Sequence, residues 1–224
     1  LPLAPISLQG SALALLLVFR TNSSYARFVE ARGLWGTAVF RARDLGQQLS
    51  VWMAPKYYDP VLQSDVKGIA LMAVCRYLVA YGWCLKAHLR SGEHSDDVVE
   101  ALFRGPEKKW ILEQPNRPLA LLHRVRQVIH SEEVGLNIAQ LDAAEQAVTG
   151  LAQVVGGTER LMSTGIPPTY TRHTTRALVM WLAALPLALA PVTVHLIHLP
   201  FQPHSTTFTF LGILEIGVQI EQPM

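Results

Sequence analysis

Hydrophobic and polar positions follow helical spacing from the start of the chain. Residues 1–19 carry no charge and are mostly apolar. At about 1.5 Å of rise per residue, this segment nearly crosses a hydrocarbon core of about 30 Å. The apolar character stops at Arg20, but Phe28, Trp35 and Val39 then continue the helical pattern at spacings of seven and four residues. The pattern therefore predicts one long helix that starts in an apolar segment and continues into a charged one.

The middle of the chain has the pattern of helices outside a membrane. Residues 67–90 are apolar, but Arg76 lies at their centre. A central arginine costs at least about 2.5 kcal/mol in a membrane helix. We therefore expect a buried helix of a soluble region here, with a transmembrane span as the alternative. Prolines and glycines punctuate the polar stretch 91–118, and helical patterns follow at 118–132 and 137–163.

The strongest transmembrane signal is the stretch 177–199, which carries no formal charge. We expect Pro186 and Pro191 to bend this helix or to divide it. Arg172 and Arg176 come directly before the stretch. Arginines at that position favour a cytoplasmic-type side of the membrane for this end of the helix.

These patterns predict an all-α protein whose long helices continue from a membrane into a helical soluble region. At 1–40 we expect a membrane-spanning helix that continues into the soluble region. The soluble helical region itself is expected at 41–165, and a turn followed by transmembrane helices at 166–224. The chain begins inside an apolar run without a methionine and ends at Glu-Gln-Pro-Met. We therefore expect a fragment that is truncated at both ends.

Composition supports a membrane protein. Of the 224 residues, 50% are hydrophobic and only 16% are charged, whereas soluble domains carry about 25% charged residues. The mean hydropathy is +0.24. The net charge of +2 is too small to indicate a nucleic-acid partner. The two cysteines, Cys75 and Cys84, fall on roughly opposite faces of a helix, so neither a local disulfide nor a metal site follows from them.

Candidate chemistry is sparse along the chain. Glu215 lies in the apolar stretch 206–220. An ionisable group there either serves a function or sits at the membrane edge, bonded to a neighbouring helix. His195, His198 and His204 lack the tight spacing of a zinc site. Because no set of carboxylates, nucleophiles or metal ligands could carry a reaction, we expect no enzyme activity.

A face of small and apolar side chains runs along the first predicted span. Ala4, Leu8 and Ala12 share this face at spacings of four residues. Several subunits could combine such faces into a hydrophobic constriction that gates by dewetting. Small residues are also enriched where membrane helices pack together. The residues alone favour the packing face over the constriction.

A dense set of charged, amide and aromatic residues follows the first apolar segment, in FRTNSSYARFVEARGLWG at 19–36. Its distinctive members are Phe19, Arg20, Asn22, Tyr25, Arg27, Phe28, Glu30, Arg32 and Trp35. This pattern resembles the second helix of the bestrophin family. Three further stretches agree with that family in the same order along the chain, namely LKAHLR at 85–90, IPPTYTRHTTR at 166–176 and LGILEIGVQIEQP at 211–223. The residues of these stretches are most similar to those of the plant and algal chloroplast branch of the family.

The resemblance implies a homopentameric anion channel, mostly helical, with one central pore. Its narrow apolar neck would lie at Ala4, Leu8 and Ala12, and a second aperture would lie at Ile166. The permeant ions would be chloride and, as in algal relatives, bicarbonate. The partners would be further copies of this chain and membrane lipids, with no nucleic acid. The chloroplast branch implies the thylakoid membrane, with the plasma membrane as the alternative.

Two features differ from animal members of the family. Their neck is bulky, whereas two of the three neck positions here are alanine, which predicts a wider constriction. Animal members bind calcium through an acidic cluster that follows the segment matching EQPM, and this sequence ends at Met224, before that cluster. Gln219 and Gln222 match positions that help this calcium clasp, but amide and backbone oxygens alone bind calcium poorly. We therefore expect no cofactor, with calcium left open.

An anion could be held in the predicted neck without fixed cations. Helix N-termini that point at a common axis each offer about half a positive charge and free N–H groups. No arginine or lysine lies in residues 1–19, so an ion bound there can leave again, as conduction requires. The competing hypothesis is a non-conducting membrane scaffold or assembly factor that uses the same helices for packing.

Overall fold

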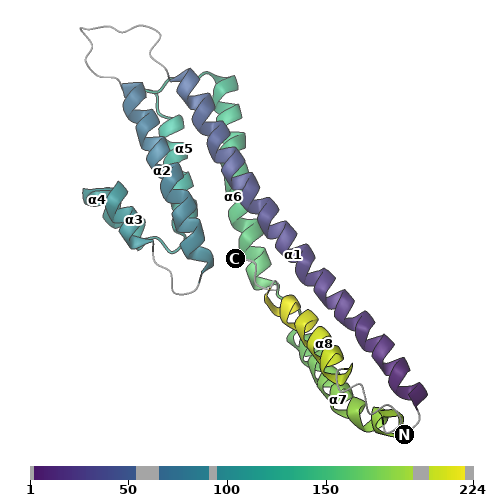
Figure 1. The fold of residues 1–224 in the computed structure, drawn as a ribbon. Coiled ribbons are helices and arrows are strands. Elements are labelled where there is room, and N and C mark those ends of the chain that lie inside the picture. The colour runs from purple at the N-terminus through teal and green to yellow at the C-terminus, as the bar shows by residue number, and fades with distance from the viewer. Residues whose placement is uncertain (1–2, 54–65, 91–94, 194–201, 220–224) are drawn as a thin grey trace. The chain divides into compact units, whose positions relative to one another are not determined.

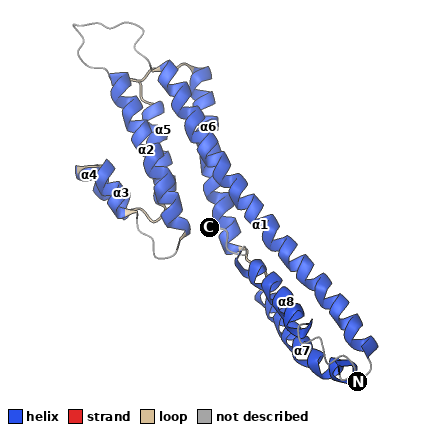
Figure 2. Cartoon of the chain, in the orientation of Figure 1, coloured by secondary structure: helices blue, strands red, loops and turns tan. Residues whose placement is uncertain are grey.

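The computed structural model describes the backbone at residues 3–53, 66–90, 95–193 and 202–219, and side chains at 7–53, 67–90, 95–188 and 207–219. Within these ranges the chain is helical and contains no strand (Figure 2). The predicted all-α class is thereby confirmed. The helices are α1 Leu3–Trp52, α2 Val66–Leu89, α3 Asp96–Leu102, α4 Gly105–Glu113, α5 Arg117–Ile129, α6 Ile138–Ser163, α7 Pro168–Thr193 and α8 Gln202–Gln219 (Figure 1).

The chain forms two compact units. The terminal unit contains Leu1–Ala31 and Ser163–Pro223, and the central unit contains Arg32–Met162. Helix α1 contributes its first part to the terminal unit and its second part to the central unit. The division into three segments that the sequence suggests stays a prediction.

A single unbroken helix, α1, runs through the transition from apolar to charged sequence. Its hydroxyl side chains bond back to the carbonyl oxygens one turn earlier. Thr21 Oγ1 donates to Leu17 O at 2.9 Å, and Ser23 Oγ donates to Phe19 O at 2.9 Å. Such bonds satisfy polar side chains within an apolar helix without a partner helix. The long helix predicted across Arg20 is therefore present.

The core of the central unit is built by α2, α5, α6 and the second part of α1. Its fully buried side chains come from all four helices and include Leu45, Leu49, Val74, Tyr81, Leu85, Leu121, Val125, Val148, Leu151 and Val155. Each fully buried aliphatic side chain of this kind contributes about 1.5–3 kcal/mol. Helix α6 lies alongside α1 (Figure 1), so closely that a Cβ added at Gly157 would meet the Leu34 side chain at 2.9 Å.

Helix α2 has one buried face and one exposed face. By length and composition, Lys67–Leu89 is the one helix among the described residues that could cross a membrane. Its Tyr81 is fully buried, and the Tyr81 hydroxyl donates to Leu151 O of α6 at 2.9 Å. Arg76 and Trp83 are exposed, and Trp83 keeps 53% of its surface. The sequence predicted a buried helix here, but it did not indicate the exposed apolar face.

In the terminal unit, α7 and α8 pack together beside the first part of α1. The Tyr170 hydroxyl of α7 donates to Leu16 O of α1 at 3.3 Å. The Trp181 ring lies against Gly10, where an added Cβ would be only 2.8 Å from it. The same ring meets Phe210 of α8 edge-on, with ring centroids 5.4 Å apart. The absence of a side chain at position 10 therefore permits the close approach of α7 to α1.

The predicted span 177–199 falls partly within α7, which ends at Thr193, and residues 194–199 lie outside the described part of the chain. Helix α7 passes through Pro186 and Pro191 without a division. Each proline removes a single backbone donor, and neighbouring groups can compensate for that loss in an apolar helix. The prolines therefore do not split the segment into two helices.

Candidate functional site

The first part of α1 presents one packed face and one exposed face. Leu13 and Leu17 are buried inside the terminal unit. The opposite face carries an apolar stripe, which we define as Leu8, Ala12, Leu15 and Phe19. All four residues are exposed, and Leu8 keeps 72% of its surface. Spacings of four, three and four residues align them along one side of the helix.

Two of the predicted neck residues, Leu8 and Ala12, belong to this stripe. The side chain of the third, Ala4, lies outside the described residues. Sequence reasoning missed the continuation of the stripe to Leu15 and Phe19, although the same spacing would have indicated it. An exposed apolar face without charge can line a pore or contact another copy of the chain, so the neck assignment stays a prediction.

Arg20, the first charged residue of α1, is almost completely buried. Only 1% of its surface is exposed, and Ser24, one turn further along, is also buried. The family motif by itself does not tell whether Arg20 faces an ion path or anchors the helix. Because a buried guanidinium is stable only among compensating polar groups, its position indicates an internal role within this chain.

Arg27 connects α1 to the turn between α6 and α7. Its Nη1 donates to the backbone carbonyl oxygen of Thr164. That turn also carries Ile166, the predicted aperture residue, whose side chain is half-buried. The turn then enters α7 with Pro168 as its first residue, a position that suits proline because no helical N–H bond is lost there. The structure thus brings a residue of the family motif next to the predicted aperture.

The remaining motif residues lie on the surface of the single chain. Phe28 is half-buried, whereas the side chains of Phe19, Asn22, Tyr25, Glu30, Arg32 and Trp35 are exposed. Exposed aromatic side chains such as Tyr25 and Trp35 are enriched where proteins contact one another. Two arginines of the motif, Arg20 and Arg27, therefore organise the chain itself, and Tyr25 and Trp35 present exposed aromatic surface.

Glu215 is exposed on α8 and accepts a hydrogen bond from Gln219 Nε2 at 3.1 Å. Gln222, the other residue considered for calcium, lies outside the described residues, as do His195 and His198. Among the described residues, no three His, Cys, Asp or Glu side chains are grouped to hold a metal ion. The role of Glu215 and the calcium question both stay predictions.

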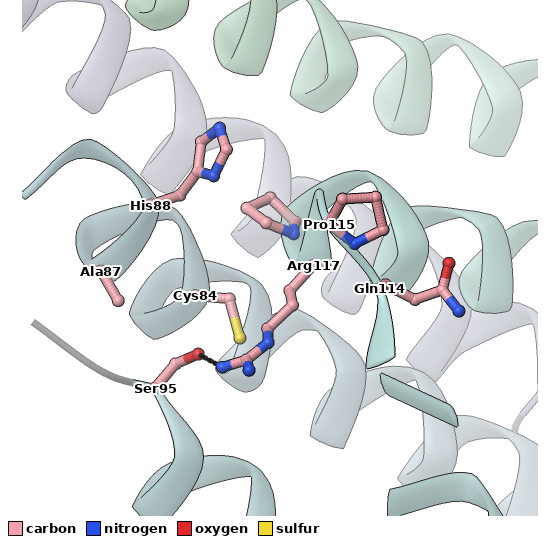
Figure 3. Close-up of a pocket in the computed structure, with 8 residues that line it drawn as sticks. Cys84, Ala87, His88, Ser95, Gln114, Pro115 and Arg117 are labelled. Atoms are coloured by element: carbon pink, nitrogen blue, oxygen red, sulfur yellow. Dashed lines mark hydrogen bonds between the residues drawn. The ribbon is translucent and has the colours of Figure 1, made fainter. Parts of the chain in front are cut away.

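A cavity of about 250 Å³ in the central unit lies beside Cys84 and Arg117 (Figure 3). Nη1 of Arg117 donates to Ser95 Oγ at 2.8 Å and to Asp96 Oδ1 at 2.5 Å. Burial raises the pKa of the Cys84 thiol, which therefore stays protonated and unreactive. His88 also lines the cavity, but its Nε2 pairs with a carboxylate oxygen of Glu159 at 2.8 Å. These contacts hold α2, α3, α5 and α6 together, and we assign the cavity a structural role.

Comparison with known proteins gives one consistent family. The chloroplastic voltage-dependent chloride channel 1 of Arabidopsis thaliana is 32% identical over 219 residues, which cover 98% of this chain and 50% of that protein. A voltage-dependent anion channel-forming protein of Synechocystis is 30% identical over 227 residues, which cover 100% of this chain and 70% of that protein. The chain thus spans about half the length of its chloroplastic relatives. Both relatives are named as channels rather than enzymes.

The solved structures agree with the sequence relatives. The crystal structure of a bacterial bestrophin homologue from Klebsiella pneumoniae has a TM-score of 0.88 at 31% identity, covering 100% of this chain and 78% of that one. The family described as bacterial and fungal bestrophin protein matches residues 1–224. The resemblance seen in the motif at 19–36 is thereby confirmed, and this chain belongs to the bestrophin family.

Proposed function

We propose that this chain is the pore-forming part of an anion channel, assembled as a homopentamer around one central pore. The names of its relatives, which are anion and chloride channels, support chloride as the permeant ion. Bicarbonate is a second permeant ion in this proposal. The observation that carries the proposal is the apolar stripe of α1, which is exposed and uncharged on a helix whose opposite face is packed.

The stripe suits a constriction through which ions pass without being trapped. Leu8 and Ala12, with Ala4 one turn earlier, form the neck in this proposal. Apolar rings of this kind gate by dewetting. The first turn of α1 has free N–H groups and a partial positive charge, which attract an anion without binding it as a lysine ring would. Arg20 supports this arrangement because its burial keeps a full positive charge away from the neck.

Ile166 forms the second aperture in this proposal. Its turn is tied to α1 by the hydrogen bond from Arg27 to Thr164 O. The hydrogen bond thus links the pore helix α1 directly to the turn that forms the aperture. A change at the neck end of α1 would be transmitted along a continuous helix to the residue that holds the aperture.

Assembly through α1 is supported by its exposed apolar and aromatic side chains. Beyond the apolar stripe they include Tyr25, Val29, Trp35, Val39 and Phe40. Exposed apolar and aromatic side chains in such number are typical of helices that contact other proteins or lipid. Head-to-tail contacts between identical chains close into rings when the rotation permits. Counting subunits in detergent by mass photometry separates this proposal from a scaffold, because a monomer or dimer would favour the scaffold.

The membrane that holds the channel is the thylakoid membrane in this proposal, with the plasma membrane as the alternative. The chloroplastic relative supports the first. Cell fractionation with an antibody against the chain decides between them. Membrane lipids are the surrounding partners, and nucleic acid has no part in the function.

Planar-bilayer recording of the full-length protein tests the proposal. In a KCl gradient we expect a current whose reversal potential moves toward the chloride equilibrium potential. Replacing chloride by bicarbonate should leave a measurable current. A cation-selective current, or purified pentamers that carry no current, would contradict the proposed function.

A further inference from the structure

An apolar groove of about 500 Å³ runs between α1 and α7 in the terminal unit. The two helices are antiparallel along it, because Tyr170 of α7 meets Leu16 of α1 and Trp181 meets Gly10. Only one lining side chain, Gln9, is polar. The lining residues are Gln9, Ala12, Leu13, Leu16, Ala177, Met180, Trp181 and Ala184. Grooves of about 300–1,000 Å³ are the usual size for small-molecule sites.

Two arginines lie beyond one end of this groove. Arg172, His173 and Arg176 are all exposed in the first turns of α7. His173 precedes Ala177 by four residues, and Arg176 precedes Met180 by four, so these two side chains extend the helix face that lines the groove. Arg172 lies one turn before Arg176. Within the described part of the terminal unit, neither arginine has an acidic partner. The groove therefore passes directly from apolar walls to uncompensated positive charge.

We propose that this groove binds one anionic phospholipid. The phosphate of the headgroup pairs with Arg172 and Arg176, and an acyl chain lies between Ala177, Met180 and the facing side of α1. A neutral lipid would give the two arginines no anionic partner, and a soluble anion would leave the apolar walls of the groove exposed to water. An amphipathic anion satisfies both parts of the site, since guanidinium groups bind phosphate strongly and acyl chains gain from apolar burial.

The position of the groove connects the lipid to the pore. Ala12 lines the groove and also belongs to the apolar stripe of α1. A bound acyl chain would lie directly beside the helix that forms the neck. This inference rests on the membrane location in the proposed function, and it adds a specific lipid that holds α1 against α7.

Lipid titration of the purified full-length protein tests the site. Phosphatidylglycerol is added to the protein in a neutral detergent, and bound lipid is measured by native mass spectrometry. We expect binding to be about fivefold weaker for Arg172→Gln or Arg176→Gln alone, and about thirtyfold weaker for both together. Arg43→Gln with Arg104→Gln is the matched control, because both arginines are exposed in the central unit. This control should bind as tightly as the unmodified protein.

A second variant tests the groove itself. Ala177→Phe fills the space between the helices and should lower phosphatidylglycerol binding while the subunit count stays the same. Equal binding by the double arginine variant and its control would overturn the proposal. It would also be overturned if inorganic phosphate displaced the lipid, or if Ala177→Phe disrupted assembly while lipid binding persisted. In the last case the groove would be a contact between subunits.

The two proposals fail separately. Lipid binding is measured by native mass spectrometry, which does not depend on conduction. A protein that conducts anions but does not bind phosphatidylglycerol therefore contradicts only the lipid site. A protein that binds the lipid at this groove and carries no current contradicts only the channel. Vesicles of phosphatidylcholine with and without phosphatidylglycerol provide the functional comparison once binding is established.

Discussion

Arg27 donates a hydrogen bond from Nη1 to the backbone carbonyl oxygen of Thr164, although the two residues are 137 positions apart in the chain. The bond joins the family motif on α1 to the turn that carries Ile166. It gives this arginine a structural task that its place in the motif did not reveal.

Replacing Arg27 should loosen the aperture turn more than it destabilises the protein. A single hydrogen bond from a charged, partly exposed donor contributes about 1 kcal/mol, so Arg27→Gln should lower thermal stability only slightly. We expect a larger change in single-channel conductance, because Ile166 would lose its fixed position. Arg27→Lys is the control that keeps the charge but not the reach of the guanidinium. Normal conductance in both variants would contradict a link between Arg27 and the aperture.

Arg20 should matter for folding rather than for ion selectivity. Its side chain is buried and interacts within the chain, and leaving a buried polar partner unsatisfied costs about 1–3 kcal/mol. Arg20→Gln should therefore lower the unfolding temperature by several degrees, whereas Arg43→Gln, at an exposed position, should not. The ratio of anion to cation permeability in the surviving channels should be unchanged. A shift of that ratio without loss of stability would place Arg20 in the ion path instead.

Much of the fold could be predicted from the periodicity of the chain. The helix expected at 137–163 corresponds to α6 Ile138–Ser163, and the helix expected at 118–132 corresponds to α5 Arg117–Ile129. Both carry apolar residues at helical spacing over several turns. In the stretch 91–118 the sequence shows only polar residues, prolines and glycines, yet the structure contains α3 and α4 there. Helices of two turns show too few periods for the pattern to be recognised.

The site was less predictable because it depends on which side of each helix is covered. Sequence spacing groups Leu8 with Ala12, but it cannot tell an exposed stripe from a packed one. Arg20 and Arg32 look alike in the motif, whereas one is buried and the other exposed. The bond from Arg27 to Thr164 depends on the path of the whole chain between them. Such contacts have no local signal.

The two cysteines should differ sharply in reactivity. Cys75 is exposed and Cys84 is buried on the same helix. Burial raises the pKa of the Cys84 thiol, so its reactive thiolate forms only at higher pH than in an ordinary cysteine. At mildly alkaline pH, a thiol-specific chromogenic reagent should modify one cysteine in the folded protein and both after denaturation. Cys75→Ser should abolish the reaction of the folded protein, and a persistent fast reaction would show that Cys84 is accessible.

Shortening the neck side chain should open the constriction. Leu8 is the largest of the three proposed neck residues and is mostly exposed in the single chain, so Leu8→Ala should widen the pore with little loss of stability. We expect a higher basal current in planar bilayers, with anion selectivity retained because no charge is changed. Leu119→Ala is a matched control, since Leu119 is an exposed leucine on α5, outside the terminal unit. Leu8→Phe should reduce the current for the converse reason. If both Leu8 variants conduct like the unmodified channel and like the Leu119→Ala control, Leu8 does not line the pore, and the apolar stripe must serve subunit or lipid contacts instead.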